Sequence, residues 1–467
     1  MPKQKRIINL PISKHINVNF REYALYVLNN RGIPSFYDAL TTIQRFILQN
    51  TPTNFTKTIS VIGNCISSGY HHGDSSLAGA INKLARSFNC ANQILEGDGF
   101  FGTPINHEAA APRYTSVKIN SEIYNIIKEN QFLNTKDKDD KWNPFYVRIP
   151  IGLSTLIVGI GVGYKTTILP RRIEDIEKYL KNEIKEVKPY FKNFKGKIKK
   201  FKNLNHSWII EGVIKKNKEK KIVHITSLPP LMRYEKFLKK IQNLIEKYGN
   251  KISVTNNSSD NIDILITLKT GDENEFENLF KTIENFVKII VTETIVFVKD
   301  DMVLVYDKIE DYLDDFKYRI AELDVKRTEY FLNKTIFEFE YQKAKKLYLE
   351  FMIKKQRTEN EISEFLKNFD KKISNRLENI LLRYLSKEEL KRTIKKIKDL
   401  EKEKKKLEKD FKKYNKIFEK IKNNIKIKGI QNRKTKFVDL FDDSDFDEIE
   451  GVEVFKFDEE TESFQFD

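Results

Sequence analysis

Two long stretches after residue 306 carry apolar residues at a spacing of three or four, interrupted by Arg327, Lys334 and Lys404, and this spacing constrains the fold more than any other feature. It is the spacing of helices that pack lengthwise, with Lys and Glu at most other positions. We expect two arms of a long antiparallel coiled coil, joined by a globular helical tip at about 352–386. A plain helical bundle is the alternative that the periodicity leaves open. The apolar positions are Phe316, Ile320, Leu323, Tyr330, Phe337, Tyr341, Ala344, Tyr348 and Phe351, followed by Leu400, Leu407, Phe411, Tyr414, Phe418 and Ile421.

The first part of the chain carries shorter patterns. Residues 21–50 predict a helix, a break at "NNRGIP" and a second helix, and a third helix is predicted near Ser76 to Phe88. The glycines of "EGDGFFG" and the alternating "YTSVKI" then predict a hairpin with a tight loop. Helices followed by a hairpin are typical of a winged helix.

Strand-like and helical segments alternate between about 171 and 305, which indicates an α+β unit. The apolar run from Ile149 to Tyr164 is short for a membrane span and rich in glycine, so we interpret it as buried backbone. We therefore expect an α+β multidomain protein. Its parts are an N-terminal arm at 1–20, a winged-helix domain at 21–140, a mixed α/β domain at 141–305, a coiled coil at 306–430 and an acidic, disordered tail at 431–467.

Charge is distributed unevenly. The chain has 84 Lys and Arg against 67 Asp and Glu, a net charge of +17. Residues 438–467 hold thirteen Asp or Glu and one Lys, so they carry −12 and the preceding chain carries +29. A body this basic favours a polyanionic partner such as nucleic acid.

The cysteine count and the N-terminal residues indicate in which cellular compartment the protein works. Cys65 and Cys90 are the only cysteines, so neither a disulfide framework nor a zinc site is encoded. The opening "MPKQKRIINLPISKH" lacks the apolar segment of a signal peptide. We expect a cytoplasmic protein with no membrane association.

The dipeptide Arg113-Tyr114, within "HEAAAPRYTSVKI", combines two complementary chemistries. A tyrosine phenol has an ordinary pKa near 10 and needs help to become a nucleophile. A guanidinium can hold a phosphate bidentately and stabilise the charge that builds at phosphorus. The pair suits reversible attack on a phosphodiester, although an ordinary strand start is the alternative for an isolated Arg-Tyr.

The surrounding motifs favour the chemical interpretation. "GYHHGDSSLAGAINKLARSF" followed by "EGDGFFGTPINHEAAAPRYT" resembles the breakage-reunion region of type IIA DNA topoisomerases, the family that includes gyrase A and eukaryotic topoisomerase II. Upstream "YVLNNRGIPSFYDALTTIQRFIL" and downstream "IPIGLSTLIVGIGVGYKTTILP" resemble further segments of that family. The resemblance covers about residues 20–425 and implies a winged-helix DNA cleavage domain, a tower domain and a C-gate coiled coil.

The resemblance also implies roles for individual residues. Tyr114 would form the 5′-phosphotyrosyl bond and Arg113 would support it. The remaining positions are Arg31 near the scissile phosphate, His72 near the nucleophile, Lys57, Arg45 and Ser75 as DNA contacts, and Ile160 as a wedge between base pairs. Structural alternatives stay open: a helix-end cation for Arg31, a solvated face for Arg45, a turn cap for His72 and plain core for Ile160.

The sequence departs from the family pattern in the "DALTT" segment. Ala39 replaces a glycine, Thr41 a lysine, Thr42 a proline and Phe46 the second of two arginines, so we expect fewer DNA contacts from that helix.

Parts of a complete topoisomerase are missing from the sequence. It has no P-loop, no topoisomerase-type nucleotide-binding glycines, and no Glu plus DxD cluster for Mg²⁺. We therefore expect Mg²⁺ and ATP to be bound by an ATPase/TOPRIM partner subunit, because bacteria and T-even-type bacteriophages divide the enzyme into separate subunits. The sequence resembles the medium subunit of the T-even-type phage topoisomerases. The absence of a β-pinwheel after the coil favours relaxation and decatenation over negative supercoiling.

The sequence-based hypothesis is thus a DNA cleavage and religation subunit that acts on double-stranded DNA as a homodimer, within an ATP-dependent type II topoisomerase. A non-enzymatic DNA-binding coiled-coil protein is the rival, and it leaves the ordered YHHG, GDGFFG and PRYT motifs unexplained.

Overall fold

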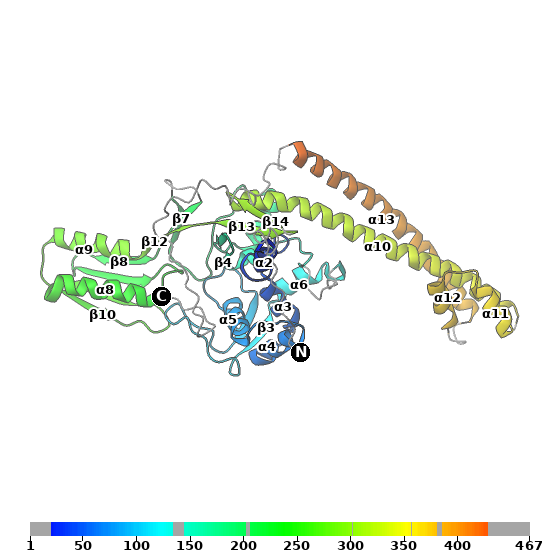
Figure 1. Ribbon diagram of the computed structural model, residues 1–467, viewed down its shortest axis with the longest axis horizontal. Coiled ribbons are helices and arrows are strands. Elements are labelled where there is room, and N and C mark those ends of the chain that lie inside the picture. Colours follow the sequence, from blue (N-terminus) through cyan, green and yellow to red (C-terminus); the bar gives the residue numbers. More distant parts are fainter. Residues whose placement is uncertain are drawn as a thin grey trace, which may run out of the picture.

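The computed structural model describes residues 20–133, 144–201, 206–300, 302–355, 357–380 and 385–427. The expected N-terminal arm, apart from Phe20, and the acidic tail lie outside these residues. The described chain has a central body, a lobe with two helices at one side of it, and an arm of two long helices that extends from the other side (Figure 1).

The central body begins with helices around a small antiparallel sheet. Its helical elements are α2 (Arg21–Val27), η2 (Leu28–Gly32), α3 (Thr42–Asn50), α4 (Thr58–Ser67), α5 (Asp74–Ala85), α6 (Ser121–Lys128) and η3 (Gln131–Leu133). The sheet has the order β1-β3-β2 and consists of β1 (Thr56–Lys57), β2 (Leu95–Asp98) and β3 (Ser116–Ile119). Apolar residues of α3, α4 and α5 pack with β2 and β3 into one core.

Helix starts in this body follow from local side chains. Thr41 and Gln44 form a reciprocal capping box at α3, and Asn120 accepts from the backbone N–H groups of Glu122 and Ile123 at α6. These contacts satisfy donors that the first helical turn leaves without intrahelical partners. They place α3 and α6 at defined positions along the chain.

A second segment of the central body interlocks with residues 28–40. It comprises η4 (Ile151–Ser154) and the hairpin of β4 (Ile157–Gly161) and β5 (Tyr164–Ile168). A side chain on Gly159 would overlap the carbonyl oxygen of Gly32, and one on Gly152 would overlap that of Ala39. Glycine is therefore required wherever these two stretches of backbone touch.

The expectation that Ile149 to Tyr164 is buried throughout is wrong for its second half. Ile151 and Leu153 are buried, but Val158 is 60% and Ile160 74% exposed. Alternate residues of a strand point to opposite faces, and one face of β4 is open to solvent.

The lobe contains two antiparallel sheets. One has the order β12-β7-β6 and the other β10-β11-β9-β8. Helices α8 and α9 lie along the second sheet (Figure 1), with Phe237, Ile241 and Leu279 buried among its apolar residues. The elements are β6 (Lys197–Lys200), β7 (Ser207–Glu211), β8 (Val213–Asn217), β9 (Ile222–Ser227), α8 (Tyr234–Tyr248), η5 (Gly249–Lys251), β10 (Ile252–Asn256), β11 (Ile264–Leu268), α9 (Glu273–Phe286) and β12 (Lys288–Thr292).

The expected boundary between the first two domains, at residue 141, does not match the packing. Phe145, Val147 and Ile151 belong to the core of α3, α4 and α5. Helix α7 (Ile173–Leu180) and the hairpin of β13 (Ile295–Lys299) and β14 (Met302–Tyr306) also share a core with the central body. The lobe proper consists of the strands and helices between β6 and β12.

The arm is anchored by an aromatic cluster. Tyr312 in α10 (Ile309–Lys354) is fully buried, stacks on Phe297 at a centroid distance of 4.0 Å, and donates a hydrogen bond to the carbonyl of Phe36 at 2.9 Å. Burial raises the pKa of its phenol well above the ordinary value. The base of the arm is thereby joined to residues 36–40.

Two long helices form where the apolar spacing predicts them. Helix α13 (Lys387–Ile427) returns along α10 in the antiparallel sense, and α11 (Glu359–Leu366) and α12 (Lys371–Glu378) form the tip (Figure 1). Tyr341, Tyr348, Leu366 and Leu377 pack into a core at this tip. Over the described ranges, no helix is both long and apolar enough to cross a bilayer.

The glycine contacts generate a prediction. Gly159→Ala should destabilise the fold by about 1–3 kcal/mol or more, because the new Cβ overlaps backbone that cannot move independently. Gly63→Ala is the matched control: its Cβ meets nothing within 4 Å on the exposed side of α4, so it should stabilise by about 0.5–1 kcal/mol. Urea unfolding measures both, and equal effects would contradict the interlock.

Candidate active site

Tyr114 lies in a turn directly before β3 and presents its ring to solvent. The backbone N–H of Tyr114 donates to the carbonyl of Ala111 at 2.9 Å, which closes the turn. The side chain is 66% exposed. The Arg113 guanidinium carbon lies 5.0 Å from the centroid of the phenol ring. The dipeptide thus offers a phenol and a cation together on the surface.

The N-terminus of α4 holds this turn from both sides. The N–H of Thr58 donates to the carbonyl of Thr115 at 3.0 Å, and that of Ile59 donates to the carbonyl of Pro112 at 3.3 Å. The hydroxyls of Thr58 and Thr115 are 2.8 Å apart and buried. First-turn N–H groups of a helix lack intrahelical partners, so they can fasten the loop through its backbone. The side chains of Arg113 and Tyr114 take no part in this fastening.

The glycine loop "GDGFFG" forms the other wall of the turn. Asp98 pairs with Ser116 across β2 and β3. Gly99 has φ of +105°, and a Cβ there would come within 3.3–3.4 Å of Thr115 and of the Tyr114 carbonyl. The N–H of Ala110 donates to the carbonyl of Phe100 at 2.9 Å. The loop therefore approaches the backbone of Tyr114 closely and leaves its ring free.

Three further expected residues lie on neighbouring elements. Lys57 is exposed and pairs with Ser116, two residues after Tyr114. His72 is half-buried in the turn before α5, with its ring edge-on to Tyr70 at 5.4 Å. Ser75 is exposed in the first turn of α5, where its N–H donates to the Asp74 carboxylate at 2.8 Å.

The structure brings the "NNRGIP" and "VGIGVG" segments together. Gly32 in η2 touches the backbone of Ile160 and Gly161. The side chain of Arg31 lies outside the described part of the structure, so only its backbone is placed, next to this contact. Ile160 is 74% exposed on β4, which excludes the interpretation as plain core.

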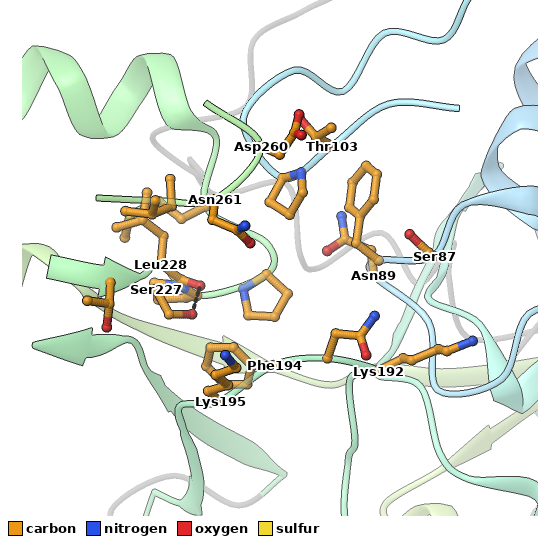
Figure 2. A pocket seen from close by; sticks show the side chains of 18 of the residues that line it. Ser87, Asn89, Thr103, Lys192, Phe194, Lys195, Ser227, Leu228, Asp260 and Asn261 are labelled. Carbon is orange, nitrogen blue, oxygen red and sulfur yellow. Dashed lines mark hydrogen bonds between the residues drawn. The ribbon is translucent and has the colours of Figure 1, made fainter. Parts of the chain in front are cut away.

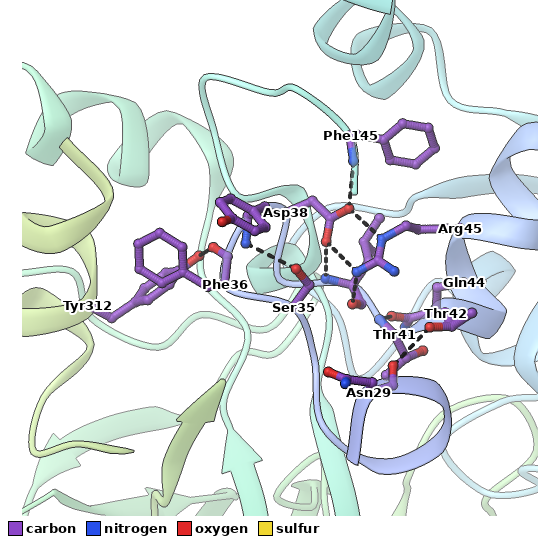
Figure 3. Close-up of polar contacts among 12 residues, drawn as sticks. Asn29, Ser35, Phe36, Asp38, Thr41, Thr42, Gln44, Arg45, Phe145 and Tyr312 are labelled. Atoms are coloured by element: carbon purple, nitrogen blue, oxygen red, sulfur yellow. Dashed lines mark hydrogen bonds and ion pairs between the residues drawn. The ribbon is translucent and has the colours of Figure 1, made fainter. Parts of the chain in front are cut away.

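Arg45 is buried, and this contradicts the expectation that it contacts DNA. Its Nε donates to Asp38 Oδ2 at 2.7 Å and its Nη2 to Asp38 Oδ1 at 3.2 Å (Figure 3). Nη2 also donates to the carbonyl of Leu40 at 3.0 Å. Only 5% of the residue is exposed. The guanidinium therefore binds Asp38 inside the protein and does not present its charge to solvent.

Cys65, Cys90 and His107 are less well suited to act as nucleophile or base. Burial raises the pKa of the Cys65 thiol to about 12 and that of Cys90 to about 11, so the reactive thiolate is scarce at neutral pH. Burial, assisted by the nearby Arg86, lowers the pKa of His107. The Tyr114 phenol, in contrast to these three groups, has direct access to solvent.

A cleft of about 330 Å³ lies away from this turn. It opens between Ser87 and Asn89 on the central body and Leu228 and Asn261 on the lobe, with Lys192 nearby (Figure 2). Neither Arg113 nor Tyr114 lines it. The candidate site is therefore an open surface that is distinct from this cleft.

The side chains present do not fit a resident metal site. In the ranges that the structure covers, no group of three or more His, Cys, Asp and Glu side chains could hold a metal ion. Carboxylate oxygens are the donors that Mg²⁺ prefers.

Comparison with known proteins decides the family. A family model for the A subunits of DNA gyrase and topoisomerase IV matches residues 31–426. The chain belongs to this family. It is 28% identical over 241 residues to the DNA topoisomerase medium subunit of Enterobacteria phage T4, a match covering 49% of this chain and 54% of that protein. The DNA gyrase A protein of Clostridium acetobutylicum is 30% identical over 192 residues, 38% of this chain and 23% of that protein.

A solved structure shows the same fold. The crystal structure of the Plasmodium falciparum topoisomerase II DNA-binding, cleavage and re-ligation domain aligns with a TM-score of 0.71 at 22% identity, covering 90% of this chain and 65% of that chain. The matches with the curated relatives span about half of the phage protein and under a quarter of the gyrase protein. The resemblance to the gyrase A family expected from the motifs is confirmed.

The structure shows the backbone conformation of Ala39, which stands where the gyrase A family pattern has glycine. Ala39 has φ of +58°, in the left-handed region that glycine adopts without steric cost. Ala39 is fully buried and belongs to the core that includes Phe36 and Leu153. Packing of its methyl group offsets part of the backbone strain.

Sequence reasoning missed the two threonines and the buried carboxylate. Thr115 follows directly after Arg113-Tyr114, so its position in the motif was the available signal. Asp38 lies seven residues before Arg45, a spacing that carries no pattern of its own.

The buried ion pair generates a second prediction. Arg45→Met should destabilise the fold by about 3–5 kcal/mol, because it leaves the Asp38 carboxylate buried without its countercharge. Arg172→Met is the matched control, since Arg172 binds Asp175 with nearly the same two-bond geometry but is 48% exposed. That pair should contribute at most about 1 kcal/mol. Thermal or urea unfolding compares them, and a mild effect of Arg45→Met would contradict the structural role.

Proposed function

We propose that this chain is the DNA cleavage and religation subunit of an ATP-dependent type II topoisomerase, which opens both strands of a duplex through transient 5′-phosphotyrosyl bonds. The observation that carries the proposal is the exposed Tyr114 phenol beside Arg113, on a turn fastened by the N-terminus of α4. Membership of the gyrase A family supports it.

The cleavage step is a transesterification. The Tyr114 oxygen attacks a backbone phosphorus and loses its proton to solvent or a base, while the bond from phosphorus to the 3′ oxygen breaks and that oxygen takes up a proton. The strand then has a free 3′ hydroxyl and a 5′ phosphate esterified to Tyr114. Arg113 stabilises the negative charge that builds on the phosphoryl oxygens. Attack of the 3′ hydroxyl reverses every step, so the strand is resealed without an external energy source.

The neighbouring residues take supporting roles in this proposal. Lys57, exposed across the sheet from Ser116, and Ser75, exposed at the start of α5, contact the DNA backbone. His72 and Arg31 act near the reacting phosphate. Ile160, exposed on the β4–β5 hairpin, inserts between base pairs and bends the duplex, as apolar wedges do. Arg45 is left out because it is buried.

Two copies of the chain would act together, so that two Tyr114 residues attack opposite strands. An exposed aromatic face on α2 supports a homodimer: Phe20, Tyr23 and Tyr26 are 42%, 57% and 45% exposed and three residues apart. Faces of this kind commonly mark protein contacts. In this arrangement the central body contains the winged-helix cleavage domain, the lobe is the tower, and the arm closes the far end as a coiled-coil C-gate.

A separate partner protein would supply the rest of the enzyme. We assign ATP binding and hydrolysis, and the Mg²⁺ that assists cleavage, to an ATPase/TOPRIM subunit, because the chain's described side chains offer no suitable metal site. The complex would relax and decatenate DNA in the cytoplasm.

Tyr114→Phe tests the nucleophile. The chain is mixed with its ATPase/TOPRIM partner, plasmid and Mg²⁺, then denatured and digested with protease, and protein-linked DNA breaks are measured. The substitution should abolish the linked DNA because it removes the attacking oxygen. Plasmid affinity should change by less than about 0.5 kcal/mol, since only an exposed hydroxyl is lost.

Tyr190→Phe is the matched control, because Arg172 also lies over the Tyr190 ring, at 4.9 Å. This variant should cleave like the unmodified chain. If Tyr114→Phe still forms DNA breaks linked to protein, Tyr114 is not the nucleophile. Intact binding with no linked DNA from the unmodified chain would favour the non-enzymatic DNA-binding rival.

Lys57→Gln tests the DNA-facing surface. Loss of one phosphate contact should weaken duplex binding about equally for all sequences and lower the slope of log affinity against log salt by about 1. Lys236→Gln, at an exposed position of α8, serves as the control. Fluorescence anisotropy over a salt series measures both variants, and an unchanged slope for Lys57→Gln would remove Lys57 from the interface.

A further inference from the structure

One face of α13 carries an uninterrupted row of lysines, here named the lysine face. Successive members are three or four residues apart, so the row follows the helix on one side. At the 100° per residue of an α-helix these side chains fall within an arc of about 80°, and the row is roughly 44 Å long. Its members are Lys391, Lys395, Lys398, Lys402, Lys406, Lys409, Lys413, Lys416 and Lys420.

The lysine face points away from the arm's own core. Leu400, Leu407, Phe411 and Phe418 lie on the opposite side of α13 and are partly buried, whereas every lysine of the row is exposed. Between residues 391 and 420, no Asp or Glu falls within the same arc. Helix α13 as a whole has seventeen Lys or Arg against eight Asp or Glu, while α10 has nine against ten. The excess positive charge is therefore confined to one helix and concentrated on one face of it.

Several other cations of α13 are paired with carboxylates of the arm. Lys396 binds Glu338 of α10 at 2.9 Å, and Lys404 and Lys422 lie within 4.0 Å of Glu408 and Glu419. The lysine face forms no ion pair with any carboxylate in the described residues. Like charges three or four residues apart destabilise a helix by about 0.2–0.5 kcal/mol for each pair. A polyanion along this face would relieve that repulsion.

We propose that the lysine face is the docking surface for the acidic segment 438–467 of the same chain. That segment carries −12, and it follows the last described residue of α13, Ile427, after ten intervening residues. Thirty residues can extend to roughly 100 Å, more than the length of the row. Tethering of this kind gives a local concentration on the order of millimolar, so weak contacts suffice.

The consequence is that the chain itself controls access to the basic face of the arm. While the acidic segment covers the lysine face, the arm is shielded from duplex DNA by a competing polyanion. Displacement of the segment would expose nine positive charges along the arm. Docking is electrostatic, so it weakens as salt rises and the Debye length shortens to about 3 Å at 1 M.

Lysine acetylation tests the proposal. Three chains are treated with an amine-reactive acetylating reagent at low salt, and the rate at each lysine is read by peptide mass spectrometry: the full chain, a chain lacking 438–467, and a full-length chain whose thirteen tail carboxylates are Asn or Gln. In the full chain, the lysine face should react roughly threefold or more slowly than in the other two. The difference should vanish at about 1 M salt. Lys236 and Lys239 of α8, also exposed, should react alike in all three.

The remaining outcomes each decide against the proposal. Equal rates in all three chains would mean that the acidic segment does not dock, and protection by the uncharged tail would mean that charge is not the cause. Protection that fades on dilution would assign the contact to a second copy. Protection seen only with added duplex DNA would assign the face to DNA. Helicity of each chain by circular dichroism confirms that α13 is intact, and no readout depends on DNA cleavage.

Discussion

The buried carboxylate of Asp38 is the interaction on which the central body depends. It accepts hydrogen bonds from the backbone N–H of Leu40 at 2.9 Å and of Phe145 at 3.0 Å, and two from Arg45 (Figure 3). The backbone carbonyl of Asp38 accepts a hydrogen bond from the backbone N–H of Gly152 at 3.0 Å. A charge removed from water is tolerated only when it is paired and hydrogen-bonded in this way. The side chain thereby joins α3, through Arg45, to Phe145, which is distant in sequence, and the backbone of Asp38 joins the same place to η4 through Gly152.

The candidate site separates the groups that hold it from the groups that react. The turn around Tyr114 is fastened by backbone bonds to α4, by a buried pair of threonine hydroxyls and by close approach of the glycine loop. None of these contacts uses the phenol or the guanidinium. The fold therefore places no packing demand on the two side chains to which we assign chemistry, and both remain exposed to an incoming polymer.

Periodicity and motif order predicted much of this structure, because both leave traces along a single chain. Two helices that pack lengthwise must repeat apolar residues at three and four, so α10 and α13 were predictable. The order of YHHG, GDGFFG and PRYT was enough to predict the family. The roles of Tyr114, Arg113, Arg31, His72, Lys57, Ser75 and Ile160 stay predictions, because no measured contact with DNA tests them.

Contacts between distant segments were not predictable. Arg45 stands in an amphipathic helix, and the sequence does not distinguish a guanidinium that faces DNA from one that binds a carboxylate in the preceding turn. The apolar run from Ile149 looked buried because nothing in it shows that one face of the hairpin is open. The first domain boundary failed for a related reason: residues 144–180 fill cores formed by earlier segments, and composition does not change at that point.

The anchoring of α10 gives the arm the properties of a lever. Tyr312 and Phe316 are clamped among Phe36 and Phe297, whereas the 46 residues of the helix project to roughly 69 Å at 1.5 Å per residue. A tilt of about 5° at the clamp would displace the far end by roughly 6 Å over that length. Because Phe36 is two residues from Asp38, a small strain in the central body at this point would reach the tip as a displacement of this size.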